Sequence, residues 1–395
     1  MNADVVILGA GPTGCALGTY LRRRGASVTL VEAVERPESV VGESMLPCSS
    51  LVFEECGLDM SRYMVKHGAV FCRNGEGVRF DFSEAEAPQW TYAWQVQREV
   101  FDLQWREVAR QAGCRLVFAK ALDVDVDQGR LSTSEGDLFG DRIIDAGGRQ
   151  MWLSSKLRLR AGDQNLRNSA VGTRYSGVKS VGIDQPGDIT ICSIPAGWIW
   201  IIPFGGGLAS VGVVMTPNCA LKGTSEERLL GAIAMSPDAQ ARLDGATRVL
   251  PHRGLQDFTA TSSTFYGDKF ALCGDAATFI DPVFSSGVLL GLHGARGLAA
   301  ALDGGDLAAW ENEYREGASV FRKVIDHWYA DDFMTLALVP AQYQKPYIRR
   351  GIVSLLAGDV FDPAKKSPRS MADRMPHLAA LVRTHGLLPS ADGHA

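Results

Sequence analysis

The stretch Asp4-Val-Val-Ile-Leu-Gly-Ala-Gly-Pro-Thr-Gly14 decides how the chain begins to fold. Its apolar first half predicts a buried strand over residues 4–8, and residues 13–24 have the pattern of a helix. Ser27–Val31 is again apolar and predicts a second buried strand, which ends at Glu32. The chain therefore opens with a strand, a helix and a strand, the first half of a doubly wound parallel sheet.

The glycines of this stretch, Gly9, Gly11 and Gly14, have the spacing of a dinucleotide fingerprint. Glycine permits a tight turn and a close approach of the backbone, so that a pyrophosphate can meet the unpaired N–H groups at the helix start. An acid at the end of the second strand, here Glu32, can bond a ribose hydroxyl. These residues predict a bound dinucleotide but do not by themselves distinguish FAD from NAD.

The composition is that of an ordinary globular protein. The chain has 395 residues, of which 46% are hydrophobic and 22% are charged, and its formal net charge is -5. Acids and bases are mixed along the whole length, so nucleic acid is not expected as a partner. We also expect a cytoplasmic protein with no membrane partner, because no apolar run has membrane-spanning length and no leader precedes the first strand. Eight scattered cysteines without a Cys-x-x-Cys pair predict no metal site.

Downstream segments indicate that the nucleotide domain is discontinuous. Short apolar and polar stretches alternate over residues 116–145, which predicts a small β-meander. Residues 174–215 are rich in β-branched and aromatic side chains broken by Gly and Pro, and predict an inserted sheet. Lys269–Cys273 predicts a return to the first sheet, followed by a helix over 287–301. The pattern is then helical over residues 310–338 and 348–356, and we expect disorder over residues 389–395.

Two motifs favour FAD over NAD. Gly274-Asp275-Ala276 resembles the Gly-Asp motif of the FAD-dependent group A monooxygenase superfamily, whose acid bonds the ribityl chain. Asp145-Ala-Gly-Gly-Arg149 resembles the Asp-Ala-x-Gly-Arg element of the same superfamily. A Gly-Asp pair by itself more often forms a plain turn. Its occurrence together with the glycine fingerprint favours the interpretation as an FAD-binding motif.

This resemblance implies an α/β fold: a discontinuous Rossmann-like FAD-binding domain of the glutathione-reductase and p-hydroxybenzoate-hydroxylase type, an inserted β-sheet substrate domain and a helical C-terminal region. The expected FAD-binding domain comprises residues 1–73, 94–170 and 265–305. The expected substrate-binding sheet domain comprises residues 74–93 and 171–264, and the helical region comprises residues 306–395.

Further segments resemble one branch of that superfamily, the flavin-dependent halogenases, above all those that act on pyrrole and phenol rings. The loop beside the flavin in that family is similar to Gly42-Glu43-Ser44-x-x-Pro47. The segment with the family's catalytic lysine is similar to Lys66-His-Gly68-Ala69. The element whose arginine contacts FAD is similar to Gln95-Val96-x-Arg98-x-x-Phe101-Asp102. Trp198-Ile-Trp200-Ile-Ile-Pro203 resembles the Trp-x-Trp-x-Ile-Pro signature, and Asp281-Pro282-Val-Phe284-Ser285-Ser286-Gly287-Val288 resembles the halide-side loop. Leu355-Leu-x-Gly358-Asp359-Val360 also has a counterpart in that family.

The halogenase resemblance implies an FAD-dependent oxidoreductase that modifies an electron-rich aromatic ring. Reduced FAD (FADH2) and O2 form a hydroperoxide, and chloride or bromide attacks it to give hypohalous acid. Lys66 would escort this acid to a pyrrole, indole or phenol, by a hydrogen bond or as a chloramine. The substrate is expected to be free or attached to a carrier or peptide. No second glycine fingerprint for NADPH is visible, so we expect a separate flavin reductase as partner.

The resemblance gives each site residue a role. Lys66 is the catalytic residue, and no residue is assigned to a metal. The cofactor-binding residues are Gly9, Gly11, Pro12, Thr13, Gly14, Glu32, Ala33, Glu43, Ser44, Arg98, Asp275, Asp281, Pro282, Gly287 and Val288. The substrate or tunnel residues are Trp198, Trp200, Pro203, Phe284, Ser285 and Ser286.

Some of these residues also fit plainer roles. Trp198 and Trp200 are two residues apart, which places both rings on one face of a strand, and such a pair can simply fill a core. Ser285, Ser286 and Gly287 offer donors and a favourable dipole end to a halide, and the same residues can cap the following helix.

Two other functions remain open on the sequence alone. Some relatives resemble halogenases and yet hydroxylate, including flavoproteins that oxidise a tryptophan of a partner protein during quinone-cofactor formation. In such an enzyme the oxygen would pass directly to the ring. The other alternative is a flavin-binding protein without turnover, acting as a sensor or assembly partner.

Overall fold

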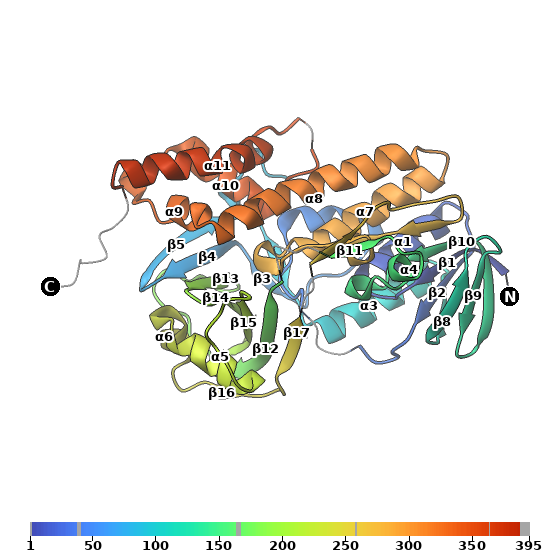
Figure 1. The fold of residues 1–395 in the computed structure, drawn as a ribbon, viewed down its shortest axis with the longest axis horizontal. Helices are drawn as coiled ribbons and strands as arrows, with labels where there is room; N and C mark the ends of the chain where they lie inside the picture. The colour runs from blue at the N-terminus through green and yellow to red at the C-terminus, as the bar shows by residue number, and fades with distance from the viewer. Residues whose placement is uncertain (1, 38–40, 163–166, 257–258, 363, 388–395) are drawn as a thin grey trace.

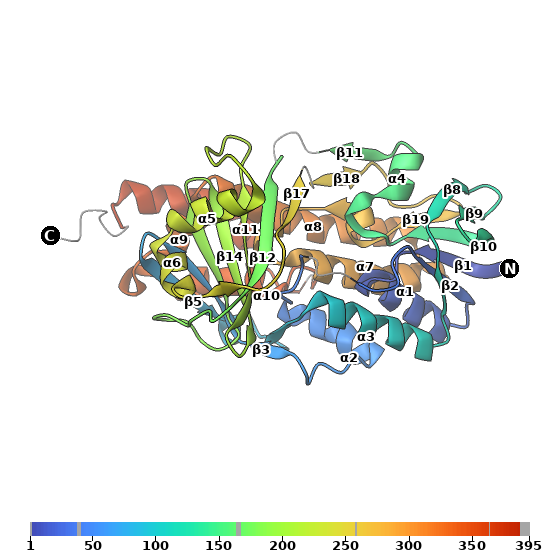
Figure 2. The same cartoon turned by 90° about the horizontal axis from the view of Figure 1, so that it is seen from below.

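The fold is that of a computed structural model, which describes residues 2–37, 41–162, 167–256, 259–362 and 364–387. A seven-stranded sheet and an eight-stranded sheet lie toward opposite ends of the molecule (Figure 1). The helix α8 (Leu307–Tyr329) lies across the region between them, as the second view confirms (Figure 2). The expected disorder over residues 389–395 lies outside the described residues.

The seven-stranded sheet belongs to the nucleotide domain. Its parallel strands follow the order β7-β2-β1-β10, and β19 pairs with the end of β10. The remaining strands, β8 and β9, form an antiparallel meander with the start of β10, as expected. The bounds are β1 (Asn2–Leu8), β2 (Val28–Glu32), β7 (Arg115–Phe118), β8 (Ala121–Asp125), β9 (Arg130–Thr133), β10 (Gly136–Asp145) and β19 (Phe270–Leu272).

Helices α1 (Pro12–Arg23), α3 (Arg98–Gln111) and α7 (Ser286–Leu302) pack beside this sheet (Figure 2). Helix α1 starts with Pro12 in its first turn, where the missing N–H has no helical partner to lose. It is followed by Gly25, whose φ of 92° takes the chain back toward β2. These elements confirm the predicted opening unit to within one or two residues.

The eight-stranded sheet is antiparallel except between β4 and β13. Its order is β16-β12-β15-β14-β13-β4-β5, and β17 also pairs with β12. The bounds are β4 (Gly68–Arg73), β5 (Glu76–Asp81), β12 (Ser169–Ser176), β13 (Ile189–Ile194), β14 (Gly197–Gly205), β15 (Leu208–Met215), β16 (Thr247–Arg248) and β17 (Arg253–Gln256).

Strand β14 shows how the two faces of this sheet are used. Ile199 and Ile201 join a small core that also includes Leu229 of α5 (Ser225–Ala234) and Ala239 of α6 (Pro237–Leu243). The alternate residues of β14, among them Trp198 and Trp200, face the main core instead. This alternation follows the two-residue period of a strand and turns both tryptophans toward the nucleotide domain.

The division of the chain into domains stays a proposal, but strand pairing bears on one boundary. Strand β4 pairs with β5 and β13, so residues 68–73 lie in the eight-stranded sheet and not in the FAD-binding part to which we assigned them. The preceding strand β3 (Met64–Lys66) pairs only with β6 (Ala93–Gln95) among the described strands. The change of sheet therefore falls at His67.

Smaller elements lie between the two large sheets and in the connections of the chain. A three-stranded sheet joins β11 (Arg160–Gly162), β18 (Ala260–Ser262) and β20 (Thr278–Phe279). Helices α2 (Ser50–Cys56) and α4 (Trp152–Lys156) and the short 3-10 helices η1 (Pro47–Ser49), η2 (Phe82–Glu84), η3 (Gly148–Gln150), η4 (Gly274–Ala276) and η5 (Pro282–Phe284) lie in the connections.

The C-terminal region is helical, as predicted. The expected run over residues 310–338 divides into α8 and α9 (Asp332–Ala337), because Asp331 has a φ of 65° and ends the first helix. The segment 348–356 lies in α10 (Pro346–Ala357), and a 3-10 turn, η6 (Ala341–Tyr343), precedes it. Among the described residues, no helix combines the length and the apolar character needed to cross a membrane.

Helix α11 (Ser367–Thr384) lies in the predicted helical region, residues 306–395, but no individual helix was predicted over its length. Pro376 lies inside it, and an internal proline normally argues against a helix. The helix buries Met371, Met375 and Leu378, which recur at intervals of three and four residues, against the neighbouring helices α9 and α10.

Candidate active site

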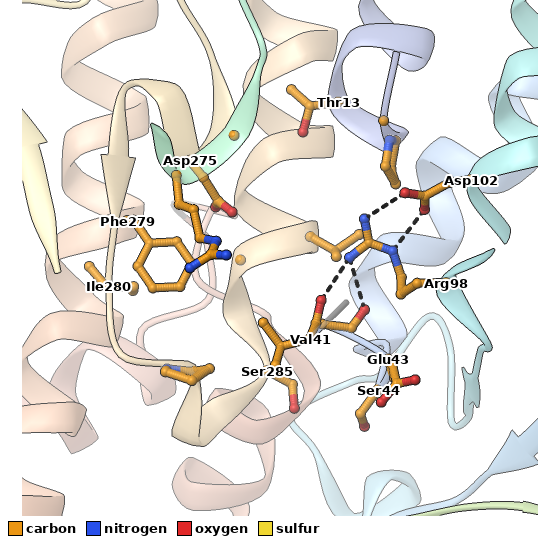
Figure 3. A pocket seen from close by; sticks show the side chains of 18 of the residues that line it. Thr13, Val41, Glu43, Ser44, Arg98, Asp102, Asp275, Phe279, Ile280 and Ser285 are labelled. Atoms are coloured by element: carbon orange, nitrogen blue, oxygen red, sulfur yellow. Dashed lines mark hydrogen bonds and ion pairs between the residues drawn. The ribbon is translucent and has the colours of Figure 1, made fainter. Parts of the chain in front are cut away.

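A cavity of about 390 Å³ lies between the two large sheets. Figure 3 shows Thr13 at one end, Ser44 and Ser285 toward the other, and Arg98 and Asp275 on opposite sides. The lining comprises Gly9, Gly11, Pro12, Thr13, Glu32, Val41, Gly42, Glu43, Ser44, Arg98, Asp102, Ala146, Gly147, Gly148, Arg149, Gln150, Ile189, Ile191, Trp198, Trp200, Ile202, Asp275, Phe279, Ile280, Pro282, Ser285, Gly287 and Val288. The cavity thus joins the dinucleotide fingerprint to the tryptophan strand and the predicted halide loop.

The fingerprint glycines have three different environments. Gly9 has a φ of 92°, and a Cβ there would lie 2.5 Å from the Ala146 carbonyl oxygen. A Cβ on Gly14 would collide with the Gly9 carbonyl oxygen, so this glycine permits α1 to pack against the turn. A Cβ on Gly11 would meet nothing within 4 Å. Gly11 lines the cavity as the N-cap of α1, so its open side can receive a phosphate.

Glu32 ends β2 at the cavity wall. Its carboxylate accepts hydrogen bonds from Ala10 N at 2.9 Å and from Val34 N at 3.0 Å, and Arg106 Nη2 lies 3.5 Å away. The backbone therefore holds the acid beside the glycine turn, where it can also accept a ribose hydroxyl. The neighbouring Ala33, also predicted to contact the cofactor, is exposed and does not line the cavity.

Arg98, the first residue of α3, holds the 41–42 loop. Its guanidinium donates to both carboxylate oxygens of Asp102 at 2.8 and 3.1 Å, and to the carbonyl oxygens of Val41 and Gly42 at 3.0 and 3.4 Å (Figure 3). Asp275 lies on the other side of the cavity. Burial raises the pKa of its carboxyl to about 6, and the positive charges of Arg98 and Arg149 oppose this rise.

Asp145 shapes the turn that carries Arg149. Its carboxylate accepts from Gly147 N and from Leu153 N, both at 2.8 Å, and burial raises its pKa to about 6. The turn after it, residues 146–150, lines the cavity. The Asp-Ala-Gly-Gly-Arg element therefore supplies cavity wall through its backbone and Arg149, while its aspartate is structural.

Lys66 is fully enclosed, with 1% of its surface exposed. Its Nζ donates to Ser44 Oγ at 2.8 Å and to the Met45 carbonyl oxygen at 2.9 Å, and lies 5.2 Å from the centre of the Phe82 ring. It does not line the cavity, but Ser44 does. Burial lowers the pKa of Lys66 to about 7, against an opposing effect of Asp188.

A neutral amine has two N–H donors and one lone pair. The two acceptors around Lys66, Ser44 Oγ and Met45 O, account for both donors. The lone pair is then free of any hydrogen bond to the described residues. An ammonium would have a third N–H donor without an acceptor among the described residues, which agrees with the pKa of Lys66 that burial lowers.

The Lys66 pKa makes the stability of the fold depend on pH. The unfolded lysine has its usual pKa of 10.5 and the folded one a pKa of about 7, so wild-type protein loses stability as the pH falls between these values, and the loss is complete below 7. Lys66→Met removes this titration, and we expect its free energy of unfolding to diverge from wild type by roughly 1.4 kcal/mol per pH unit across this window. Urea unfolding of both proteins at several pH values measures this difference. If the free energies of unfolding of the two proteins changed in parallel with pH, the Lys66 amine would not be desolvated in the folded protein.

The tryptophans of β14 lie side by side, with ring centres 6.0 Å apart, and both line the cavity. Each is fixed by its indole N–H: Trp198 donates to Tyr329 Oη and Trp200 to Ser210 Oγ, both at 3.1 Å. A Cβ at Gly212 on the neighbouring strand β15, or at Gly172 on β12 beyond it, would collide with the Trp200 ring. These two glycines therefore form the slot that holds it.

The predicted halide loop, residues 281–288, leads into α7. Ser285 has a φ of 57° although it is not glycine, and Ser285, Gly287 and Val288 line the cavity. Ser286 is completely buried, and its hydroxyl has no hydrogen-bond partner among the described residues. Such an orphaned donor at the start of a 17-residue helix fits an anion.

Some of the predicted site residues lie behind the cavity wall instead of in it. Asp281 is buried and bonded to Asn168 and Tyr329, and Phe284 packs with Phe71, Trp328 and Phe333. Besides these, Gly14, Ala33, Lys66, Pro203 and Ser286 do not line it. All the other predicted site residues do.

The sequence did not single out several lining residues. Val41, Ile189, Ile191, Phe279 and Ile280 are ordinary apolar residues, and nothing in their spacing marks them. Asn168 and Tyr329, which bond Asp281, also lack a signal because they are distant from it in sequence. Arg149 and Asp102 could have been found, since both belong to motifs that we quoted.

The glycine turn, Glu32, Arg98 and Asp275 supply the donors, acceptors and open backbone that a dinucleotide needs, so the cavity fits FAD. Fold and site together define a flavin-dependent oxidoreductase. Residues 74–332 match the family model of tryptophan halogenase, and residues 2–122 match that of an FAD binding domain. The chain therefore belongs to the tryptophan halogenase family of flavin-dependent enzymes.

Relatives agree with this assignment. The chain is 27% identical to a 1H-pyrrole-2-carbonyl-[peptidyl-carrier protein] chlorinase of Pseudomonas fluorescens over 96% of this chain and 94% of that protein. It is 30% identical to a tryptophan 2-halogenase of Chondromyces crocatus, over 88% of this chain and 69% of that protein. Among solved structures, a flavoprotein/dehydrogenase of Cytophaga hutchinsonii superposes with a TM-score of 0.88 at 26% identity, over 98% of this chain and 100% of that one.

The family membership confirms the predicted fold class and the predicted activity. The protein is an enzyme whose activity is FAD-dependent halogenation of an aromatic ring. Neither alternative, hydroxylation or flavin binding without turnover, is favoured by these relatives.

Proposed function

We propose that this enzyme uses reduced FAD, O2 and chloride or bromide to halogenate a pyrrole, indole or phenol, with Lys66 as the catalytic residue. The observation that carries the proposal is the enclosed Lys66 amine, which bonds Ser44 at the cavity wall and has a pKa of about 7. Structural lysines are seldom fully buried without a carboxylate partner, whereas a reactive amine needs such a setting.

Bound FAD, once reduced, would activate O2, and the activated oxygen would be the two-electron oxidant that turns halide into hypohalous acid within the cavity. The turn at Gly11 and the N–H groups at the start of α1 would bind its pyrophosphate, Glu32 its ribose and Asp275 its ribityl chain. Arg98 positions the 41–42 loop along the same wall.

Residues of the halide loop would hold the anion. Gly287 and Val288 line the cavity, and their backbone N–H groups lie in the first turn of α7, whose dipole favours negative charge. The Ser286 hydroxyl, which has no hydrogen-bond partner among the described residues, lies directly behind them. Ser285 is fixed in the left-handed conformation, which turns the chain sharply at this point. This proposal explains why a non-glycine residue adopts that conformation at the cavity wall.

Lys66 then accepts the electrophilic halogen. Its neutral amine attacks the halogen of hypohalous acid, an N–halogen bond forms, and the released hydroxide takes the amine proton to leave as water. Ser44 and Met45 hold the amine through its hydrogen bonds. The halogen would pass from nitrogen to a ring carbon of the substrate, and the proton lost by that carbon would restore the amine.

For the substrate, we propose first a pyrrole attached to a carrier protein. The chlorinase relative named above, which matches this chain along almost its whole length, acts on such a substrate according to its name. A tryptophan 2-halogenase is also a relative, so free tryptophan is the second candidate. We propose a separate flavin reductase as partner, because the sequence shows no second glycine fingerprint for a nicotinamide dinucleotide.

The proposed function is tested by mass spectrometry of candidate aromatic compounds after incubation with the holoenzyme, a flavin reductase, NADH, O2 and bromide. We expect a product that carries the two-peak isotope pattern of bromine, formed only when bromide is present. Pyrrole-2-carboxylate on a carrier protein, free tryptophan and simple phenols are compared in parallel. A product that gains oxygen without bromine would replace halogenation by hydroxylation.

A further inference from the structure

Buried hydrogen bonds join the end of α8 to the cavity wall. The hydroxyl of Tyr329, the last residue of α8, donates to Asp281 Oδ2 at 2.7 Å and accepts from Trp198 Nε1 at 3.1 Å. Asn168 Nδ2 lies 2.8 Å from the same carboxylate oxygen and 2.8 Å from the Tyr329 hydroxyl. Four residues from four separate parts of the chain thus share one small network.

The second oxygen of Asp281 shapes the halide loop. Asp281 Oδ1 accepts from Val283 N at 3.1 Å and so caps η5, the turn immediately before Ser285. Asp281 is completely buried, so its carboxylate depends on these protein donors for its solvation. If Asp281 loses the Tyr329 or Asn168 donor, its carboxylate must shift toward other donors or water, and the turn it caps shifts with it.

We propose that Tyr329 and Asn168 are positioning residues for halide binding. Both donate to Asp281, and Asp281 fixes the loop whose N–H groups would bind the halide. Tyr329 also accepts the indole N–H of Trp198 and so fixes this ring relative to the loop. This inference rests on the proposed function of residues 285–288. Neither side chain lines the cavity, so Asn168 and Tyr329 act on the loop through Asp281, and Tyr329 acts on Trp198 through its own hydroxyl.

The geometry separates this role from simple packing. Tyr329→Phe keeps the ring and removes only the hydroxyl that links Asp281 with Trp198. Asn168→Ala removes the second donor to Asp281, together with the hydrogen bond from Asn168 to the Tyr329 hydroxyl, and leaves the bond from Tyr329 to Asp281 in place. A purely structural role would lower the melting temperature and leave halide affinity unchanged, whereas a positioning role weakens halide binding in the folded holoenzyme.

The test measures bromide binding to the FAD-loaded protein by titration of tryptophan fluorescence, together with KM for bromide and kcat in steady state. For Tyr329→Phe and Asn168→Ala we expect Kd and KM for bromide to rise about tenfold, as for loss of a hydrogen bond to a charged group. At saturating bromide the halide site is filled in the variants as in wild type, so kcat should stay within about twofold of wild type. We also expect Kd for FAD to be unchanged.

Tyr20→Phe is the matched control. Tyr20 also donates its hydroxyl to a carboxylate, Glu55 Oε2 at 2.5 Å, but lies in the second half of α1 and does not line the cavity. We expect no change in bromide affinity for this variant. Bromide affinities in Tyr329→Phe and Asn168→Ala that equal wild type would overturn the inference alone. Absence of bromide binding in wild-type holoenzyme would instead overturn the proposed halide site, and the inference with it.

Discussion

Lys66→Met should abolish halogenation, with the rate of product formation falling by on the order of a thousandfold, while FAD binds as in wild type. The amine is the nucleophile that receives the halogen in our proposal, and methionine fills the same space without one. Because Lys66 is enclosed and its charged form is disfavoured by burial, the substitution should leave the free energy of unfolding equal or higher at neutral pH. Loss of activity would therefore not reflect loss of the fold.

The measurement is the rate of brominated product under single-turnover conditions, with FAD affinity and urea unfolding recorded on the same protein. Lys179→Met is the control, since Lys179 is exposed and pairs with Asp244 at the surface. We expect wild-type rates for that variant. A Lys66→Met enzyme that still brominated its substrate at a comparable rate would remove Lys66 from the mechanism.

Gly11→Val should raise Kd for FAD by on the order of a hundredfold without unfolding the protein. No atom of the described residues lies within 4 Å of a Cβ at Gly11, so a valine side chain fits there. Its side chain would project from the N-cap of α1 into the cavity, where the pyrophosphate must approach the backbone closely. Titration of the apoprotein with FAD, followed by flavin fluorescence, measures the change.

Gly162→Val is the control for this substitution. A Cβ at Gly162 also meets none of the described residues within 4 Å, but Gly162 ends β11 and does not line the cavity. We expect FAD to bind this variant as it binds wild type. Gly14→Val should behave differently from both, because its side chain would collide with the Gly9 carbonyl and destabilise the domain before any ligand binds. If Gly11→Val bound FAD normally, the pyrophosphate would have to lie elsewhere.

The local pattern was sufficient to predict the elements around the cofactor. The glycine turn, the buried strands on either side of it and the position of Glu32 could be predicted from backbone sterics and the two-residue period of a strand. These effects act within a few neighbouring residues. The same alternation placed Trp198 and Trp200 on one face of β14, and the structure confirms it. The alternation alone did not predict which face of the sheet lies toward the cavity, because this depends on which face α5 and α6 cover.

The resemblance to halogenases picked out Lys66 by its place in a short motif, but nothing in the sequence gave its environment. Its hydrogen bonds run to residues 44 and 45, more than twenty positions earlier, and its pKa follows from burial that these contacts complete. Helix α11 was missed for a related reason: its apolar face outweighs the internal proline only when α9 and α10 are present to receive it.

The sequence by itself determined the dinucleotide turn, because that turn depends on residues close together along the chain. Short motifs far apart in the sequence, through their resemblance to a family, also indicated the discontinuous nucleotide domain and the class of chemistry. Only the tertiary structure decided that the amine of Lys66 is enclosed and that Tyr329 and Asn168 meet at Asp281. These contacts join positions up to 161 residues apart, and long-range packing, not local backbone preference, brings them together. The opening strand and glycine turn thus predict where a dinucleotide binds, and the folded chain decides which side chains line the rest of the cavity.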